Sequence, residues 1–149
     1  AVMHMLLEIG TSDKAQAWID HALANKGLVM GFGHRVYKWG DSRVPTMHDA
    51  FVDMAKIKDG NNWVEIERIV AETMLKEKDI HPNLDYPAGP AYYLMGFDID
   101  LFTAIFVVSR ITGWTAHVME QLAGNKLIRP LSVYTGSEQR EVPVISTRG

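Results

Sequence analysis

The stretch IDLFTAIFVVSRITGWTAHVMEQLA, residues 99–123, decides the fold class because it predicts one long and largely apolar helix. Asp98 stands directly before this stretch and can cap its amino end. The polar residues Arg110, His117 and Glu120 follow at spacings of seven and three, which places them within reach of one another along a helix.

The rest of the chain adds helices and no strands. Segments with apolar residues at helical spacing, between capping and stop signals, span about 11–26, 42–60 and 62–78. Ser12 or Thr11 can cap the first of these helices, and Ser42 can cap the second. Two irregular stretches lie between these helices, and the second, residues 79–96, holds three prolines and a short helix. No segment alternates as a strand does, and the chain from residue 125 on is weakly periodic and extended. The sequence therefore predicts an all-α fold.

Composition excludes several functional classes. The chain has 149 residues, 47% hydrophobic and 22% charged, and its net charge of -3 gives no field to attract nucleic acid. The absence of cysteine excludes disulfides and thiolate metal sites and fits a reducing compartment, so we expect a cytoplasmic protein. The longest apolar run, from Leu101, is broken by Ser109 and Arg110 short of the roughly 20 residues of a membrane span.

Two features at the start of the chain bear on its completeness. No signal-peptide pattern is present. The chain opens without an initiator methionine on the helix-like run AVMHMLLEIG. We therefore expect it to be a piece of a longer protein.

The first irregular stretch contains GFGHRVYKWGDSR, residues 31–43, and carries a histidine behind two glycines. Gly31 and Gly33 let the backbone approach a ligand and leave amide N–H groups free to donate. His34 is therefore either a loop histidine held by hydrogen bonds or a group with a chemical role. The GFG run lacks the remaining glycine and the preceding strand of a dinucleotide fingerprint.

Asp85 lies in the second irregular stretch, in PNLDYP, with the apolar neighbours Leu84 and Tyr86. An aspartate at such a position is ordinarily a helix cap. Alternatively, partial desolvation would raise the basicity of its carboxylate, as a general base for a carbon acid requires. His34, His48 and Asp85 match no compact metal-binding pattern in their spacing, so we predict no metal site.

Three arginines are candidates for binding an anion. Arg110 lies within FTAIFVVSRITGW, where an unpaired guanidinium would be costly to bury. It needs either an internal partner such as Glu120 or Asp98, or a substrate carboxylate held by two hydrogen bonds. Arg43 follows an Asp-Ser pair just before a helix, where a surface ion pair is the simpler interpretation. Arg129, in LIRP, would ordinarily be a surface arginine.

Taken together, three segments resemble the carboxyl-terminal part of the citrate synthase family. GFGHRVYKWGDSR resembles the family signature, in which a Gly-aromatic-Gly-His run is followed by an aliphatic residue, a basic residue and Asp-Pro/Ser-Arg. NLDYPAGPAYYLMGF resembles the second active-site segment of the family. FTAIFVVSRITGWTAHVMEQ and NKLIRPLSVYTG resemble its final long helix and tail. The segments occur in the same order as in the family, and the likeness covers essentially the whole chain. The stretches PNLDYPAGPAYYLMGF and SRITGWTAHVMEQ resemble the bacterial branch of the family, in which citrate synthase and 2-methylcitrate synthase activities both occur.

The resemblance implies a mostly helical homodimer whose small and large domains close over the site. Residues 1–96 would belong to the small domain and residues 97–149 to the carboxyl-terminal part of the large domain. The implied reaction condenses acetyl-CoA or propionyl-CoA with oxaloacetate, by enolisation, carbonyl attack and thioester hydrolysis, to citrate or 2-methylcitrate plus CoA. Coenzyme A enters as a thioester co-substrate, and no tightly bound cofactor is implied.

The resemblance also implies roles for individual residues. Asp85 would be the general base that removes a proton from the acyl carbon, and His34 would hydrogen-bond the ketone oxygen of oxaloacetate. Arg43 and Arg110 would hold carboxylates of oxaloacetate and product, and Arg129 would reach into the neighbouring subunit's site. The residues expected to lie against coenzyme A are Leu28, Val29, Met30, Gly31, Phe32, Gly33 and Lys38.

One departure from the family pattern limits what this chain can do alone. The second catalytic histidine of the family, in a His-Gly-Gly-like segment, would lie upstream of the present sequence, as would other residues of the oxaloacetate pocket. We therefore expect the chain alone to be inactive and to require the N-terminal part of the same protein. The alternative hypothesis is a truncated, non-catalytic helical homologue that binds a partner or forms a dimer.

Overall fold

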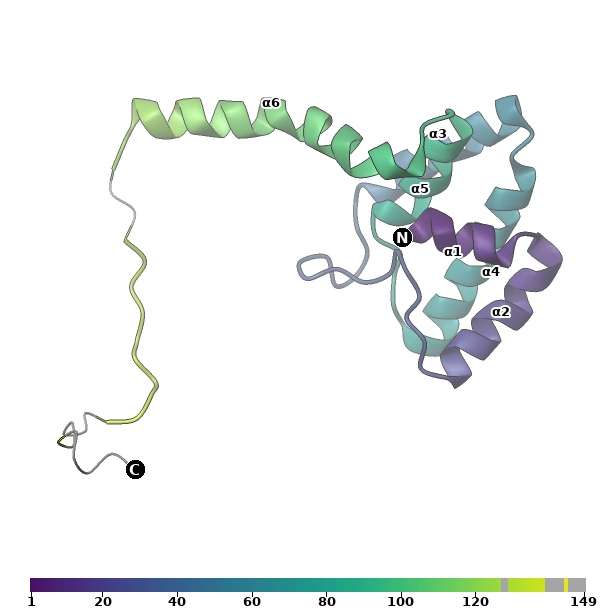
Figure 1. Cartoon of the computed structure of the whole chain (residues 1–149), viewed down its shortest axis with the longest axis horizontal. Helices are drawn as coiled ribbons and strands as arrows, with labels where there is room; N and C mark the ends of the chain where they lie inside the picture. The colour runs from purple at the N-terminus through teal and green to yellow at the C-terminus, as the bar shows by residue number, and fades with distance from the viewer. Residues whose placement is uncertain (127–128, 139–143, 145–149) are drawn as a thin grey trace. The chain divides into compact units, whose positions relative to one another are not determined.

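The computed structural model describes residues 1–126, 129–138 and 144, and the described part of the chain is helical (Figure 1). The elements are α1 (Val2–Ile9), α2 (Ser12–Ala24), α3 (Val44–Lys58), α4 (Asn61–Lys78), α5 (Asp85–Leu94), a 3-10 turn η1 (Ile99–Leu101) and α6 (Phe102–Ala123). No strand occurs among these residues, and one isolated bridge pairs Phe32 with Pro82. The predicted all-α fold is confirmed.

The chain divides into two compact units, Ala1–Arg110 and Ile111–Gly149. The first contains α1 to α5 and the start of α6, and the second contains the rest of α6 and the residues beyond it. After Ala123 the described residues form no helix or strand, as the weak periodicity predicted. The predicted domain boundary at Gly96, a glycine with a φ of 88° just after α5, concerns the complete protein and stays a prediction.

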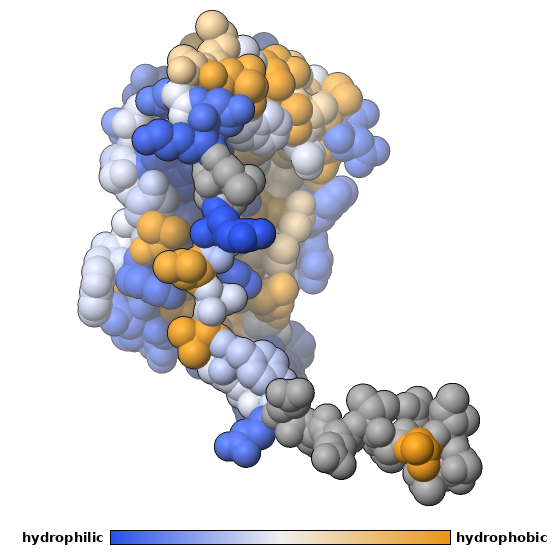
Figure 2. Space-filling view, turned by 90° about the vertical axis from the view of Figure 1, so that its left-hand side faces the viewer, coloured by the Kyte–Doolittle hydropathy of each residue, from blue (hydrophilic) through white to orange (hydrophobic). Residues whose placement is uncertain are grey.

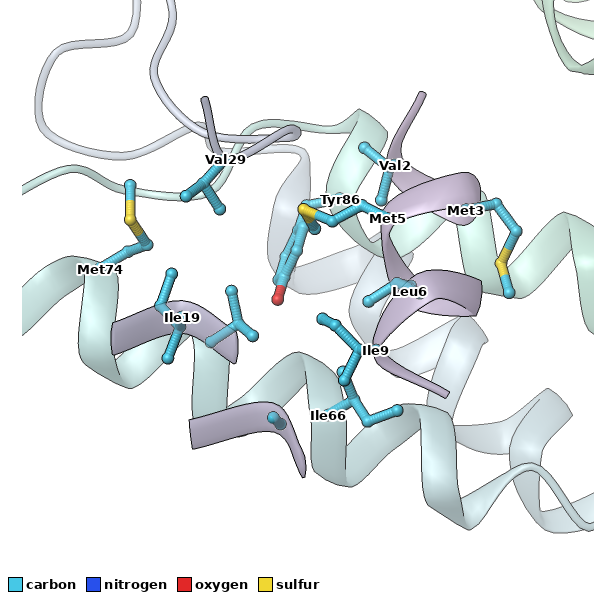
Figure 3. Close-up of a cluster of buried hydrophobic side chains, with 12 residues drawn as sticks. Val2, Met3, Met5, Leu6, Ile9, Ile19, Val29, Ile66, Met74 and Tyr86 are labelled. Atoms are coloured by element: carbon cyan, nitrogen blue, oxygen red, sulfur yellow. The ribbon is translucent and has the colours of Figure 1, made fainter. Parts of the chain in front are cut away.

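The core of the first unit is built around α1, which contacts α2, α4 and α5 (Figure 3). This helix is apolar around most of its circumference, as a helix covered on several sides must be. Its buried residues are Val2, Met3, Met5, Leu6 and Ile9, and they meet Ile19 of α2, Ile66, Val70 and Met74 of α4, and Tyr86 of α5. A second cluster joins α3 to α5 through Phe51, Ala55 and Ala91.

The predicted helices are present, but two of them lack the expected side-chain cap. We expected Thr11 or Ser12 to cap the helix near residue 12 and Ser42 to cap the next one. In the structure, Thr11 and Arg43 occupy the N-cap positions of α2 and α3, and neither side chain makes a capping hydrogen bond. The backbone N–H of Ser12 instead donates to Oδ1 of Asn62, at 2.9 Å. A side chain from a distant part of the sequence thus bonds to a backbone N–H at the start of the helix, where a neighbouring side chain was expected to do so.

The last helix covers residues 99–123, as the sequence predicted. Ile99–Ala123 forms 25 helical residues, which by length and composition alone could cross a membrane, because the helix continues through Ser109 and Arg110. No residue of α6 is buried, and apolar side chains such as Phe106, Trp114 and Val118 are exposed. Figure 2 shows apolar side chains lying between polar ones on one face of the surface. A helix covered by other helices in a protein core has the same length and composition.

Candidate active site

The two irregular stretches of the sequence meet in the first unit. The N–H of Gly33 donates to the carbonyl of His81 at 2.9 Å, and the N–H of Asn83 donates to the carbonyl of Gly31 at 2.8 Å. With the bridge between Phe32 and Pro82, these bonds align the loop before His34 antiparallel to the segment before Asp85. The structure therefore brings together the two segments that carry the predicted catalytic residues.

The loop is fixed on its inner side by close packing against Tyr86. Gly31 has a φ of 88°, and a Cβ atom there would lie 2.7 Å from the Tyr86 ring, so only glycine fits this position. The Phe32 ring packs on Tyr86 with ring centroids 4.5 Å apart, and Val29 is buried in the core. The side chains of Val29 and Phe32 therefore face the protein, which leaves mainly their backbone groups for a ligand.

His34 is held at one ring nitrogen. Its Nδ1 accepts hydrogen bonds from the backbone N–H groups of Val36, at 3.0 Å, and Tyr37, at 3.3 Å. A nitrogen that accepts from two N–H groups carries no proton, so Nε2 carries the proton and is a donor. His34 is exposed, and Nε2 has no partner within the described part of the chain. The histidine is thus both a loop histidine held by hydrogen bonds and a free donor.

Asp85 is the first residue of α5, and its side chain is exposed. Leu84 occupies the N-cap position, and the N–H of Asp85 donates to Oδ1 of Asn83 at 3.0 Å. The interpretation of Asp85 as a capping residue is therefore wrong, since Asn83 supplies the side-chain acceptor. The expected desolvation of its carboxylate is also not found in this chain.

A cavity of about 430 Å³ lies beside Asp85. Its walls are mostly apolar and come from the loop, α1, α3, α5 and α6. Met30, Gly31, Met47, Tyr92 and Phe106 are among the lining residues. Two members of the predicted coenzyme A loop, Met30 and Gly31, therefore share a cavity with the predicted base. Leu28, Gly33 and Lys38, also predicted to lie against coenzyme A, are exposed.

Arg43 is paired with a buried carboxylate rather than with a surface one. Its Nε donates to Oδ1 of Asp41 at 2.9 Å and its Nη2 to Oδ2 at 2.7 Å. The Arg43 guanidinium lowers the pKa of Asp41 to about 2, against the opposing effect of burial, and the backbone N–H groups of Arg43 and Leu84 contribute. The Asp41 hydrogen bond in turn raises the pKa of Arg43, and the charge of Asp85 adds to this effect.

The Arg43 guanidinium is also stacked and partly accessible. Its Cζ lies 5.1 Å from the centroid of the Tyr37 ring, and its side chain is 38% exposed. The hydrogen bonds to Asp41 use Nε and Nη2, so the donors of Nη1 face no acceptor in residues 1–126, 129–138 and 144. Asp41 therefore orients Arg43 while leaving part of its guanidinium available for an anion.

Arg110 does not use the internal partners that the sequence offered. Asp98 accepts from the N–H of Asp100, and Glu120 pairs with His117 at 3.5 Å. Arg110 has no ion pair among the residues that the structure describes, and its Cζ lies 4.9 Å from the centroid of the Phe106 ring. Because Phe106 lines the cavity beside Asp85, Arg110 lies one helical turn from that cavity. Arg129 is exposed and lies in the second unit.

Sequence reasoning missed the residues that support the site. Asn83 joins the loop to α5 through its side chain. The feature of the sequence that could have indicated this role is an asparagine two residues before an aspartate at a helix start. Tyr86 donates from its hydroxyl to the carbonyl of Glu67 at 3.0 Å. The Glu67 carboxylate is buried and lies 3.1 Å from Nδ1 of His48. Burial raises the pKa of Glu67, and His48 opposes this effect.

The loop also exposes large apolar side chains. Within this loop, Trp39 is 87% exposed and Val36 is 74% exposed. Side chains of this size on a loop beside a cavity are typical of a surface that meets a ligand or another part of a protein.

These features define an all-helical protein in which a loop histidine and an aspartate at a helix start are held together by one asparagine. Residues 1–131 match the family described as citrate synthase, C-terminal domain. The chain belongs to the citrate synthase family, and the predicted resemblance is confirmed.

Individual relatives agree with this assignment. The chain is 55% identical over 147 residues to 2-methylcitrate synthase 2 of Corynebacterium glutamicum, which covers 99% of this chain and 38% of the relative. It is 57% identical over 142 residues to citrate synthase of Mycolicibacterium smegmatis, which covers 95% of this chain and 38% of the relative. The chain thus spans less than two fifths of the length of these relatives.

A solved structure supports the same fold. Citrate synthase of Thermoplasma acidophilum, in a ternary complex with carboxymethyl coenzyme A and oxaloacetate, matches with a TM-score of 0.78 at 33% identity. The match covers 99% of this chain and 41% of that chain.

Proposed function

We propose that the complete protein condenses an acyl-CoA with oxaloacetate and releases CoA with citrate or 2-methylcitrate. The observation that carries this proposal is the alignment of the His34 loop with the start of α5 in a chain of the citrate synthase family. The alignment supports a shared site for a donor to a ketone oxygen and a base for a carbon acid.

The proposed chemistry assigns a separate task to each of the two residues. The Asp85 carboxylate removes a proton from the carbon next to the thioester carbonyl, and the resulting enol attacks the ketone carbon of oxaloacetate. Nε2–H of His34 donates to the ketone oxygen, where negative charge develops during attack, and such a donor contributes about 3 to 4 kcal/mol to rate enhancement. Water then cleaves the thioester and gives free CoA and a carboxylate product.

The arginines supply the binding energy for a dianionic substrate. Arg43 is held by Asp41 with part of its guanidinium free, and Arg110 lies near the cavity without an ion pair in the described chain. Both therefore suit carboxylates of oxaloacetate and of the product. We further propose that Arg129 acts in the site of a neighbouring subunit, as in the homodimer that the family resemblance implies.

We propose that both acetyl-CoA and propionyl-CoA are substrates. Relatives named 2-methylcitrate synthase and citrate synthase are similar to this chain to nearly the same degree, at 55% and 57% identity. One additional methylene in an apolar pocket changes transition-state binding by only about 1 to 3 kcal/mol, so a few side chains decide the preference. The apolar walls of the cavity beside Asp85 suit either acyl group.

The exposed apolar surface of α6 supports a requirement for the N-terminal part of the same protein. Relatives have more than half of their length outside the matched region, which supplies enough chain to cover this helix. We also propose a cytoplasmic location, which the absence of cysteine supports.

Steady-state kinetics of the complete protein test this proposal. Release of free CoA is measured with acetyl-CoA and, separately, with propionyl-CoA, each with and without oxaloacetate. We expect CoA release that depends on oxaloacetate with both thioesters, and none from the isolated 149-residue chain. No release with either thioester would contradict the proposed reaction and favour the non-catalytic alternative.

A further inference from the structure

Asn83 uses all of its polar groups to join the two halves of the candidate site. Its backbone N–H donates to the carbonyl of Gly31 at 2.8 Å, and its Nδ2 donates to the carbonyl of Gly33 at 2.9 Å. Its Oδ1 accepts from the N–H of Asp85 at 3.0 Å, and its carbonyl accepts from the N–H of Tyr86 at 3.1 Å. Two of these bonds reach the His34 loop and two reach the first turn of α5.

The two side-chain bonds of Asn83 lie at or next to the proposed catalytic residues. Gly33 directly precedes His34, so the bond from Nδ2 fixes the peptide that leads into the histidine. The bond to Oδ1 fixes the backbone of Asp85 itself. Both bonds involve one planar amide group, whose donor and acceptor keep a fixed separation. No other described side chain bonds to both the His34 loop and Asp85.

An asparagine is the residue type that this position requires. Aspartate has the same size and keeps the acceptor for the Asp85 N–H, but when ionised it has no donor and would place a carboxylate oxygen against the Gly33 carbonyl. Glutamine carries the same amide on a side chain that is longer by one methylene. The two arms of the link can therefore be separated by substitution.

We propose that Asn83 is a positioning residue for the condensation reaction, which sets the separation of His34 from Asp85. The inference rests on the proposed function, because the two groups act on different reactants whose carbon atoms must bond. The nucleophilic carbon is generated at Asp85, and the electrophilic carbon is oriented through His34. A misplacement of about 1 Å between such groups can cost about 100-fold in rate.

The test compares Asn83→Asp and Asn83→Ala with the wild type in the complete protein. We expect Asn83→Asp to lower kcat by about 10- to 100-fold, in keeping with the cost of misplacing reacting groups, with a KM for acyl-CoA within about threefold of wild type. Asn83→Ala, which removes both side-chain bonds, should lower kcat at least as much. A kcat for Asn83→Asp within about twofold of the wild-type value would overturn the proposal.

Asn62 provides a matched control. Its Nδ2 donates to the carbonyl of Gly10 at 2.8 Å and its Oδ1 accepts from the N–H of Ser12 at 2.9 Å. It makes the same two kinds of bond between a glycine carbonyl and a helix start, but at the junction of α1, α2 and α4. We expect Asn62→Asp to lower the melting temperature while leaving kcat within about twofold. Equal losses of kcat in both aspartate variants would assign the effect to general stability and overturn the proposal.

Amide hydrogen exchange gives a readout that does not depend on turnover. We expect faster exchange in residues 31–43 in both Asn83 variants and unchanged exchange there in Asn62→Asp. Unchanged exchange in the Asn83 variants would contradict the proposed link. The wild-type rate of CoA release separately tests the proposed function, so a failure of that function and a failure of the link are distinguishable.

Discussion

The Asp41 carboxylate, which is 5% exposed, accepts two hydrogen bonds from the guanidinium of Arg43, at 2.9 and 2.7 Å. A two-point contact of this kind fixes the plane of the guanidinium. Asp41 therefore fixes the orientation of the Arg43 guanidinium, and the pair connects the stability of the fold to the proposed binding of an anion.

We expect the Asp41–Arg43 pair to stabilise the folded protein at neutral pH and to lose this effect in acid. The pKa of Asp41 is lowered in the folded protein from 3.8 to about 2, so its contribution is complete above pH 4 and is lost as the pH falls toward 2. We expect the wild type to exceed Asp41→Asn in free energy of unfolding by about 1 kcal/mol at pH 7, because the partly exposed Arg43 is screened by solvent. The difference should shrink between pH 4 and pH 2 in denaturant titrations; a difference that does not change with pH would contradict this account.

Glu67 should show the opposite pH dependence. Burial raises its pKa in the folded protein, so its contribution is most favourable below pH 4.5 and declines as the pH rises through the higher folded value. Glu67→Gln removes the buried charge and keeps a group that can bond to His48. We expect the variant to gain stability relative to wild type between pH 5 and pH 8, by about 1 kcal/mol, as measured by urea unfolding. A constant offset over this range would show that the carboxylate does not titrate as proposed.

His34→Asn separates the two functions of the histidine ring. The shorter amide places Oδ1 near the position of Nδ1, where it can accept from the N–H groups of Val36 and Tyr37, and it has no group at the position of Nε2. We expect kcat to fall by about 100- to 1,000-fold, as for loss of one donor to a developing oxyanion. Hydrogen exchange of the loop should stay closer to wild type than in His34→Ala. A kcat near the wild-type value would mean that Nε2 does not donate to the ketone.

Arg110→Lys tests the proposed binding of a carboxylate. Lysine keeps the charge but cannot make the planar two-point contact, so we expect the KM for oxaloacetate to rise by about 10-fold or more, with little change in the KM for acyl-CoA. Arg68→Lys is the control, since Arg68 pairs on the surface of α4 with Glu65 and Glu72. Initial-rate kinetics with each substrate varied in turn measure both values. Similar effects of the two substitutions would remove Arg110 from the oxaloacetate site.

The sequence predicted the helices well because their periodicity is local, and it predicted helix starts less well because their partners are distant. Ser12 depends on Asn62, fifty residues away, and no local cap pattern reveals that bond. The burial of Asp41 was also missed, for a different reason, since an Asp-Ser-Arg run is usually solvated. The expected cost of burying the Arg110 guanidinium does not arise, because Arg110 is exposed in this chain.

The sequence predicted residues of the candidate site but not the hydrogen bonds that join them. Resemblance identified His34 and Asp85, while the residue that joins them, Asn83, is visible only once the loop lies against α5. Val29 was expected to lie against a ligand, and its side chain is instead in the core, because the loop has an inner and an outer side that sequence alone does not distinguish.

Replacement of Asp85 by asparagine tests the central claim most directly. In the complete protein, acetyl-CoA or propionyl-CoA is incubated with oxaloacetate, and CoA release is followed while oxaloacetate binding is measured by calorimetry. We predict that Asp85→Asn lowers CoA release by at least about 100-fold, as expected for loss of a general base, with a Kd for oxaloacetate within about threefold of wild type. Undiminished CoA release by Asp85→Asn would contradict the assignment of Asp85 as the base.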